Sequence, residues 1–531
     1  MPLRLAGFVR VQPAPGHVTA APAGQRSSFG LRRMALTGFA ASSAVVFGAL
    51  LGGDTFKSHL PGAWLFGTAG GALGSLGPRV RHPAMIAVFL VYGGLVLLTG
   101  CWIELLRSLS RHSGTSVRAV ILVLAIWALP FVLSPPLFSH DIYSYAAQGE
   151  MASHHIDPYT YGTGVIGATS FTRLAGPLWA NTPSPYGQLF VSLDALATNV
   201  AGHQVLADLV LLRILALVGV ALCVVGLSAL SRGLGRDPAE TVVLGAGSPL
   251  VLTTLVAGAH NDALMVGLLV AGLALAMRDR PVPGIVLCAL ATGVKAPAAL
   301  GILFIGWNWA GPDASVRARI SRTFAAGLIA VVTLQGVSEL SGVGWGWVHT
   351  VSAPTKISTG VTPVDSLSHL VVAVGHLVGA GIALHSMRDA LGIVAFVAAC
   401  GLSARLLLRS PRTGTVLSLG LSLLLFALFA PVLWPWYLTW GLVTLAPVLT
   451  PRLRQGVFVL IVAGTFVGVA PVLAMAKLIL QAGLADDLLL LLGITVVALF
   501  SALELSPRGA PRARAWRTGF SRWAAPGSLG S

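Results

Sequence analysis

Residues 204–230 read QVLADLVLLRILALVGVALCVVGLSAL, an almost unbroken apolar run that decides the class of fold. A run of about 20 apolar residues is long enough to cross the ~30 Å hydrocarbon core of a bilayer as an α-helix. The whole chain shares this character, because it is 55% hydrophobic and 10% charged, with a mean hydropathy of +0.83. Soluble domains carry roughly 25% charged residues. An ordinary water-facing surface is therefore excluded, and we expect an integral membrane protein.

Apolar segments of similar length recur and predict an all-α, polytopic bundle of about 12 transmembrane helices plus a re-entrant hairpin. The spans are expected near residues 33–53, 82–105, 117–134, 204–230, 241–258, 263–277, 323–340, 389–407, 413–432, 437–450, 456–474 and 487–505. Segment 282–309 is also apolar, but basic clusters flank both of its ends and Gly293–Pro297 interrupts it. We interpret it as the hairpin. Non-helical backbone at that depth requires a protein-lined or watery cavity, which places a cavity near Lys295.

The basic residues indicate which side of the membrane each loop occupies. Most of the 34 Lys and Arg residues fall on one side, in the two tails and in short loops such as 278–280 and 317–322. The positive-inside rule makes that side cytoplasmic, so both termini are predicted to be cytoplasmic at the plasma membrane. This placement accounts for the net charge of +16 without a nucleic-acid partner. We expect residues 1–32 to be a disordered basic tail, 33–505 the membrane domain, and 506–531 a basic tail against anionic lipid headgroups.

The first large outward loop, 135–203, contains the strongest candidate for chemistry. Two prolines end the preceding membrane helix, and Ser139 is predicted to N-cap a new one. On that helix Asp141, Tyr145 and Gln148 share a face. A carboxylate at this interface is well placed to act as a base, although an Asp in a first helical turn is also favoured by the helix dipole alone. The outward loops are expected to contain interfacial helices, one of them covering a lateral opening for a lipid.

Two charged residues lie inside apolar segments, where a charge is costly and by default marks a functional site. Arg213 and Lys295 are candidates to bind a phosphate, although Arg213 is close enough to a boundary for snorkelling to explain it. Another polar group, His260-Asn261-Asp262, joins two apolar helices through a very short turn. Asn and Asp also favour such turns for purely structural reasons.

Two further motifs are explained mainly by structure. Asp157-Pro158-Tyr159 has the composition of a turn. Trp434-Pro435-Trp436-Tyr437 lies at an outward boundary, where an aromatic belt would explain it as well as stacking on a sugar would.

Several of these segments form an ordered set with a family resemblance. They are FSHDIYSYAAQG at 138–149, Asp157-Pro158-Tyr159, Pro185-Tyr186-Gly187, GAHNDAL at 258–264 and Trp434-Pro435-Trp436-Tyr437. The set resembles polyprenol-phosphate-mannose-dependent α-(1→6)-mannosyltransferases of the GT-C superfamily. The matching motifs occur in the family's order, within the membrane part of the chain, and leave the two tails and the loop at 54–81 uncovered.

The resemblance implies a substrate class and a catalytic residue. The donor would be polyprenyl-phosphate-mannose, and the acceptor a mannosylated lipid such as the growing mannan of actinobacterial lipomannan or lipoarabinomannan in the cell envelope. The catalytic carboxylate of such enzymes lies in the first large outward loop and maps onto Asp141. Many members of the superfamily have a carboxylate pair there. Here His140 stands in the preceding position, so we expect no essential metal and no other cofactor.

The expected mechanism is inverting transfer on the outward face, with Asp141 as the base. A polyprenyl phosphate is already a good leaving group, so a base and cations for the departing phosphate suffice. The phosphate candidates are Arg213, Lys295 and His260. The expected substrate-binding residues also include His140, Tyr143, Tyr145, Gln148, Asp157, Tyr186, Asn261, Asp262, Trp434, Trp436 and Tyr437.

Two alternatives remain open at this stage. The donor could be another polyprenyl-phosphate sugar, such as one of arabinose or glucose. A flippase or transporter of lipid-linked sugars would also fit a charged residue on a broken helix. A transporter predicts polar residues near the membrane midplane, however, whereas these clusters converge on the outward face.

Overall fold

The computed structural model describes residues 26–56, 64, 83–112, 114–352 and 362–469, and no strand occurs among them. The predicted all-α class is confirmed for this part of the chain. The predicted tail at 506–531, the predicted span at 487–505 and most of the tail at 1–32 lie outside the described residues. The first helix, α1 (Arg26–Gly52), begins earlier than predicted, so residues 26–32 belong to a helix and not to a disordered tail.

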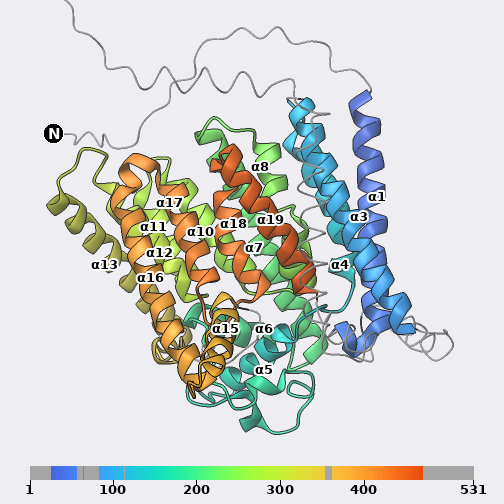
Figure 1. The fold of residues 1–531 in the computed structure, drawn as a ribbon, viewed down its shortest axis with the longest axis horizontal. Helices are drawn as coiled ribbons and strands as arrows, with labels where there is room; N and C mark the ends of the chain where they lie inside the picture. Colours follow the sequence, from blue (N-terminus) through green and yellow to red (C-terminus); the bar gives the residue numbers. More distant parts are fainter. Residues whose placement is uncertain (1–25, 57–63, 65–82, 113, 353–361, 470–531) are drawn as a thin grey trace, which may run out of the picture.

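The described helices lie roughly side by side, and a layer of shorter helices covers one end of the bundle (Figure 1). On one flank α1 packs against α3 (Pro83–Arg111) and α4 (Val117–Leu133). Next come α7 (Val205–Gly233), α8 (Pro238–Leu244), α9 (Pro249–Val251), the π-helical turn η5 (Leu252–Ala257) and α10 (Asp262–Ala276). The other flank contains α11 (Pro281–Thr292), α12 (Ala299–Trp309), α13 (Val316–Ser341), α16 (Leu384–Thr413) and α17 (Thr415–Leu428). The chain continues through η8 (Pro435–Tyr437), α18 (Leu438–Leu445), η9 (Ala446–Val448) and α19 (Pro451–Gly468).

Five described helices are long and apolar enough to cross a membrane. They are Gly30–Gly52, Ile86–Arg111, Val205–Gly233, Val316–Ser341 and Leu384–Thr413. The bent pair formed by α8 with α9 and η5, at 51°, would make a sixth. Other predicted spans among the described residues coincide with shorter helices such as α4, α10 and α17, which have 17, 15 and 14 residues.

The outer helices present large apolar side chains to their surroundings. Phe324 and Val332 on α13, and Ile393 and Val397 on α16, are all exposed. A soluble protein rarely leaves such continuous apolar faces uncovered. These faces therefore support the prediction that the chain is a membrane protein.

Segment 282–309 reverses direction where the sequence predicted an interruption. Lys295 and its neighbours separate α11 from the short 3-10 turn η6 (Ala296–Ala298), which leads into α12. A methyl group added at Gly301 of α12 would lie 3.0 Å from the Sγ atom of Cys288 on α11. Two such positions touch only if the helices fold back on one another, since one straight helix would hold them about 20 Å apart. Lys295 therefore stands at the tip of a helical hairpin.

The layer at the end of the bundle comes from the loops that were predicted to face outward. Loop 135–203 contains α5 (Asp141–Ser153), η3 (Thr163–Ile166), η4 (Pro177–Trp179) and α6 (Gln188–Val200). The second loop contains α14 (Trp347–Thr350) and α15 (Pro363–Leu377). Figure 1 shows α5, α6 and α15 together at this end. Helix α5 begins at Asp141, with His140 rather than Ser139 at the N-cap position. The Ser139 hydroxyl nevertheless accepts a hydrogen bond from the Asp141 backbone N–H at 3.1 Å.

Candidate active site

A cavity of about 450 Å³ lies where the start of α5, the tip of the α11–α12 hairpin and the segment around η8 meet. Its polar and aromatic lining consists of Asp141, Trp179, Tyr186, Lys295, Trp434, Trp436, Tyr437 and Trp440. Its lining on α12, α16 and α17 is apolar and includes Leu300, Leu303, Phe396 and Phe426. Many of the predicted site residues, separated by up to about 300 positions in the sequence, thus line one space.

Asp141 and His260 face each other at this cavity. The Nε2 atom of His260 lies 3.6 Å from Oδ2 of Asp141. The other ring nitrogen, Nδ1, is 2.7 Å from the backbone oxygen of Thr254 in the π-helical turn η5. Since a carbonyl only accepts, Nδ1 carries a hydrogen, and in the neutral ring Nε2 turns its lone pair toward the carboxylate. At 3.6 Å the two atoms are neighbours without a hydrogen bond, so an unprotonated imidazole nitrogen stands next to the Asp141 carboxylate.

The surroundings of His260 favour its neutral form. Its ring is buried and stacks on the indole of Trp436, with ring centroids 3.8 Å apart. Burial lowers the pKa of the His260 imidazole, and the Asp141 carboxylate opposes this shift. Burial therefore keeps the ring in its neutral form.

Two strained backbone positions lead into this pair. Phe138 has φ +67° and Ala259 has φ +51°, both in the left-handed region that residues with a side chain rarely adopt. The Leu137 N–H donates to the Ala257 carbonyl at 3.1 Å, which joins the two strained segments directly. Strain of this kind persists only where the surrounding structure enforces it, and it occurs often at active sites.

Arg213 holds the same two segments together. Its Nη1 donates to the carbonyls of Phe131, Val132 and Ser134 at the end of α4, and its Nη2 donates to that of Ala257, at 3.2 Å. The side chain is buried and does not line the cavity. The structure thus gives Arg213 backbone carbonyls as partners, where the sequence suggested a phosphate or snorkelling. The planar guanidinium can reach several acceptors at once, which a lysine cannot.

For the transfer reaction that the family resemblance implies, we expect Arg213→Lys to lower the turnover number about 10²-fold, because small misplacements of reacting groups have effects of that size. The KM for the donor should change little, since Arg213 does not line the cavity. Arg319→Lys is the matched control, because Arg319 binds the carbonyls of Trp307, Gly311 and Pro312 at a distance from the cavity. A raised donor KM with unchanged turnover would instead indicate a phosphate contact.

Lys295 is the only cation among the described residues that line the cavity. Its ammonium lies 3.0 and 2.8 Å from the two carboxylate oxygens of Asp262. The rings of Tyr186, Tyr437 and Trp440 surround it at 5.6, 4.7 and 5.6 Å. The Trp440 indole N–H also donates to Asp262. Lys295 is thus fixed in place at the cavity wall, with its charge largely balanced by Asp262.

The other predicted site residues fall into two groups. Trp434 stacks on Trp436 at 5.0 Å and Tyr437 packs edge-on against Trp436 at 6.3 Å, so the η8 motif forms one aromatic wall. Behind it, the buried hydroxyl of Tyr145 lies 3.4 Å from the side-chain oxygen of Asn261.

The second group stands away from the cavity lining. Tyr143 is buried, and His140 is the N-cap residue of α5. Gln148 accepts a hydrogen bond from Ser184 at 2.8 Å. Asp157 accepts from the Tyr159 N–H at 2.9 Å and from the Thr160 hydroxyl at 2.7 Å, which is the geometry of a structural turn.

Comparison with known proteins decides the family. The model described as alpha-(1→6)-mannopyranosyltransferase, N-terminal domain, matches residues 35–311, and the MptB C-terminal domain model matches residues 365–485. The chain belongs to the alpha-(1→6)-mannopyranosyltransferase family. The predicted family is thus confirmed. The region matched by the first model includes Asp141, His260 and Lys295, and the region matched by the second includes the aromatic wall at η8.

Individual members of this mannopyranosyltransferase family are similar in sequence to this chain. Alpha-(1→6)-mannopyranosyltransferase A of Mycobacterium tuberculosis is 30% identical over 387 residues, which cover 70% of this chain and 73% of the relative. A second alpha-(1→6)-mannopyranosyltransferase of that organism is 28% identical over 466 residues, covering 72% and 78%. Alpha-(1→6)-mannopyranosyltransferase A of Corynebacterium glutamicum is 30% identical over 314 residues, covering 54% and 64%. No solved structure matches the chain significantly.

Some residues that line the cavity of this chain were not predicted from its sequence. Trp440 follows Trp436 by one helical turn, and that spacing is a usable signal for a shared face. Trp179 and the apolar residues on α12, α16 and α17 carry no such signal. They meet the cavity only through the packing of distant helices.

Proposed function

We propose that the chain transfers mannose from polyprenyl-phosphate-mannose to a mannosylated lipid or lipoglycan and forms an α-(1→6) linkage. The observation that carries the proposal is the two-sided lining of the cavity. One side presents a carboxylate, a lysine and aromatic rings, and the other is apolar. A sugar phosphate attached to a long hydrocarbon chain likewise has a polar part and an apolar part. The names of the relatives supply the sugar and the linkage.

The apolar side provides a path for the polyprenyl chain. Leu303 on α12 and Phe396 on α16 line the cavity and are also exposed on the outside of the bundle. The cavity thus opens laterally toward the surroundings of the apolar helices, where lipid would lie. We propose that the prenyl chain enters there and that its phosphate stops at Lys295.

The proposed reaction needs one base and one cation. Asp141 takes the proton of an acceptor hydroxyl, whose oxygen attacks C1 of mannose from the face opposite the phosphate. The C1–O bond breaks and its electron pair leaves on the polyprenyl phosphate, so a β-linked donor gives an α product. His260 offers an unprotonated ring nitrogen beside this carboxyl group, with Nε2 3.6 Å from Oδ2. Lys295 stabilises the charge on the phosphate, and no metal takes part.

The aromatic wall at η8 is proposed to bind the sugar. Trp434 and Trp436 stack on each other and line the cavity together with Tyr186 and Tyr437. Aromatic faces pack well against the C–H faces of a sugar ring while the hydroxyls point to polar partners.

We further propose a GT-C-type membrane topology with about 12 spans, both termini in the cytoplasm and the cavity on the outward face. Hairpin α11–α12 is supported as the re-entrant element by the position of its charges. The basic residues at 278–280, and those at 317–322 in the first turns of α13, lie beyond the outer ends of the two helices, and Lys295 lies at the opposite end. The cavity therefore faces the side away from these basic residues, which is the outward side by the positive-inside rule.

Reconstituted vesicles would test this proposal. The purified chain is expected to transfer radiolabelled mannose from polyprenyl-phosphate-mannose to a short α-(1→6)-mannoside, with an α-(1→6)-linked product. Polyprenyl-phosphate glucose and arabinose serve as matched donors, and transfer from one of them in place of mannose would overturn the sugar assignment. Movement of the donor across the bilayer without product would overturn the enzyme assignment in favour of a flippase.

A further inference from the structure

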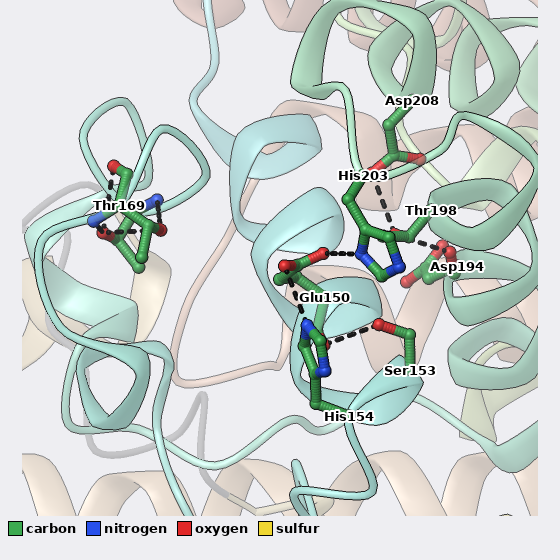
Figure 2. Close-up of polar contacts among 9 residues, drawn as sticks. Glu150, Ser153, His154, Thr169, Asp194, Thr198, His203 and Asp208 are labelled. Atoms are coloured by element: carbon green, nitrogen blue, oxygen red, sulfur yellow. Dashed lines mark hydrogen bonds and ion pairs between the residues drawn. The ribbon is translucent and has the colours of Figure 1, made fainter.

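A second cluster of polar residues lies outside the cavity, on the same outward layer. Glu150 lies on α5, His154 is the C-cap residue directly after α5, and His203 lies in the turn between α6 and α7. Figure 2 shows the Glu150 carboxylate between the two imidazole rings. Its two oxygens are 3.2 Å from Nε2 of His154 and 2.8 Å from Nδ1 of His203. Nothing in the proposed transfer reaction uses these three residues.

The arrangement has the geometry of a metal site. The three ligand atoms lie within 4.8 Å of one another. In a tetrahedral zinc site with bonds of about 2.1 Å, neighbouring ligand atoms are about 3.4 Å apart. Glu150 and His154 are separated by one helical turn, which places two ligands on one helix face. The His154 and His203 rings are stacked with their centroids 5.1 Å apart, and each ring nitrogen meets a different oxygen of the Glu150 carboxylate.

The backbone that supplies His203 is also unusual. Gly202 has φ +60° and His203 has φ +57°, so a residue with a side chain occupies the left-handed region directly after a glycine. This turn brings the imidazole back onto α5. Helices α5 and α6 are closely packed here, because a methyl group added at Gly149 would lie 2.6 Å from the Thr198 hydroxyl and 2.7 Å from the Asp194 carbonyl.

We propose that Glu150, His154 and His203 bind a divalent cation of the zinc class, with water in the fourth position. Two imidazoles and one carboxylate suit Zn²⁺ and its neighbours in the transition series, whereas Ca²⁺ and Mg²⁺ prefer oxygen ligands alone. The side chains are partly open, with relative exposures of 15% for Glu150, 57% for His154 and 42% for His203, so an ion can enter from solvent. None of the three lines the cavity.

The site would fasten the end of α5 to the turn that leads into α7. Helix α5 begins with Asp141 and ends near Glu150 and His154, so both of its ends would be tied to neighbouring elements. The cation is thus a structural support for the catalytic helix and not a participant in the transfer.

Binding of Zn²⁺ itself to the full-length, tag-free protein in detergent tests this inference. After stripping with a chelator and adding ZnCl₂, the wild type is expected to retain one Zn²⁺ per chain through dialysis, as measured by elemental analysis. Zn²⁺ should also raise its melting temperature. His203→Asn is the main variant, because Asn tolerates the left-handed backbone but removes the imidazole. His155→Asn is the matched control, since His155 is an exposed neighbour with φ +58° outside the cluster.

The two variants give opposite expected results. His155→Asn should keep the bound ion and the thermal shift, and His203→Asn should lose both. Glu150→Gln preserves the size of the side chain and removes its charge, and it should lose the ion and the thermal shift as His203→Asn does. It tests the site independently if His203→Asn does not fold. Equal retention of Zn²⁺ by the wild type, His203→Asn and Glu150→Gln would overturn the site. So would a wild type that retains none.

Discussion

Asp141→Asn is expected to abolish mannose transfer while leaving the fold intact. The substitution keeps the size and shape of the side chain but removes the group that can accept a proton. Loss of a positioned general base lowers rates by about 10²–10⁴-fold. The side chain is only partly buried, in the first turn of α5, and it lines the cavity. Stability should therefore change little.

Transfer of radiolabelled mannose at equal protein concentration measures this effect. Asp157→Asn is the matched control from the same loop, because the carboxylate of Asp157 holds a turn and does not line the cavity. Its activity should stay close to that of the wild type. Normal turnover by Asp141→Asn would remove Asp141 from the mechanism, and equal losses in both variants would indicate a structural role for the loop.

Lys295→Met is expected to destabilise the protein strongly. It leaves the Asp262 carboxylate, which is fully buried, without its ammonium partner. Breaking a buried ion pair by removing one partner costs about 3–5 kcal/mol. The double variant Lys295→Met/Asp262→Asn should recover much of this stability, since a neutral amide can still accept from Trp440 and buries no charge.

The same pair of variants separates the two roles of Lys295. Unfolding in detergent reports the stability, and mannose transfer reports the activity. If Lys295 stabilises the departing phosphate, the double variant folds but remains inactive. Recovery of both properties would restrict Lys295 to a structural role. Arg111→Met, which breaks the exposed pair with Glu104, serves as the stability control and should cost about 0–1 kcal/mol.

Several features of the site could be predicted because their signals are local in the sequence. Asp141 follows a helix-ending pair of prolines, and Lys295 stands at a Gly and Pro interruption of an apolar run. Trp434, Trp436 and Tyr437 lie together at a helix boundary. Each of these residues lines the same cavity in the structure. Short-range patterns such as these are set by backbone geometry and helix capping, which depend on neighbouring residues alone.

The partners of the charged residues could not be predicted in the same way. Arg213 binds carbonyls on two segments, and one of those carbonyls belongs to Ala257. Lys295 pairs with Asp262, and His203 reaches Glu150 on α5. All of these contacts join residues far apart in the chain.

The sequence by itself determined that this is a helical membrane protein of a mannosyltransferase family, since apolar run length and ordered motifs suffice for that. Only the tertiary structure decided how its charges are used. A cation in an apolar segment must find an acceptor, because leaving it unpaired out of water is prohibitively costly. Which acceptor it finds depends on which helices pack together. Packing brought a carboxylate to Lys295 at the cavity and backbone carbonyls to Arg213 behind it, although both residues look alike in the sequence.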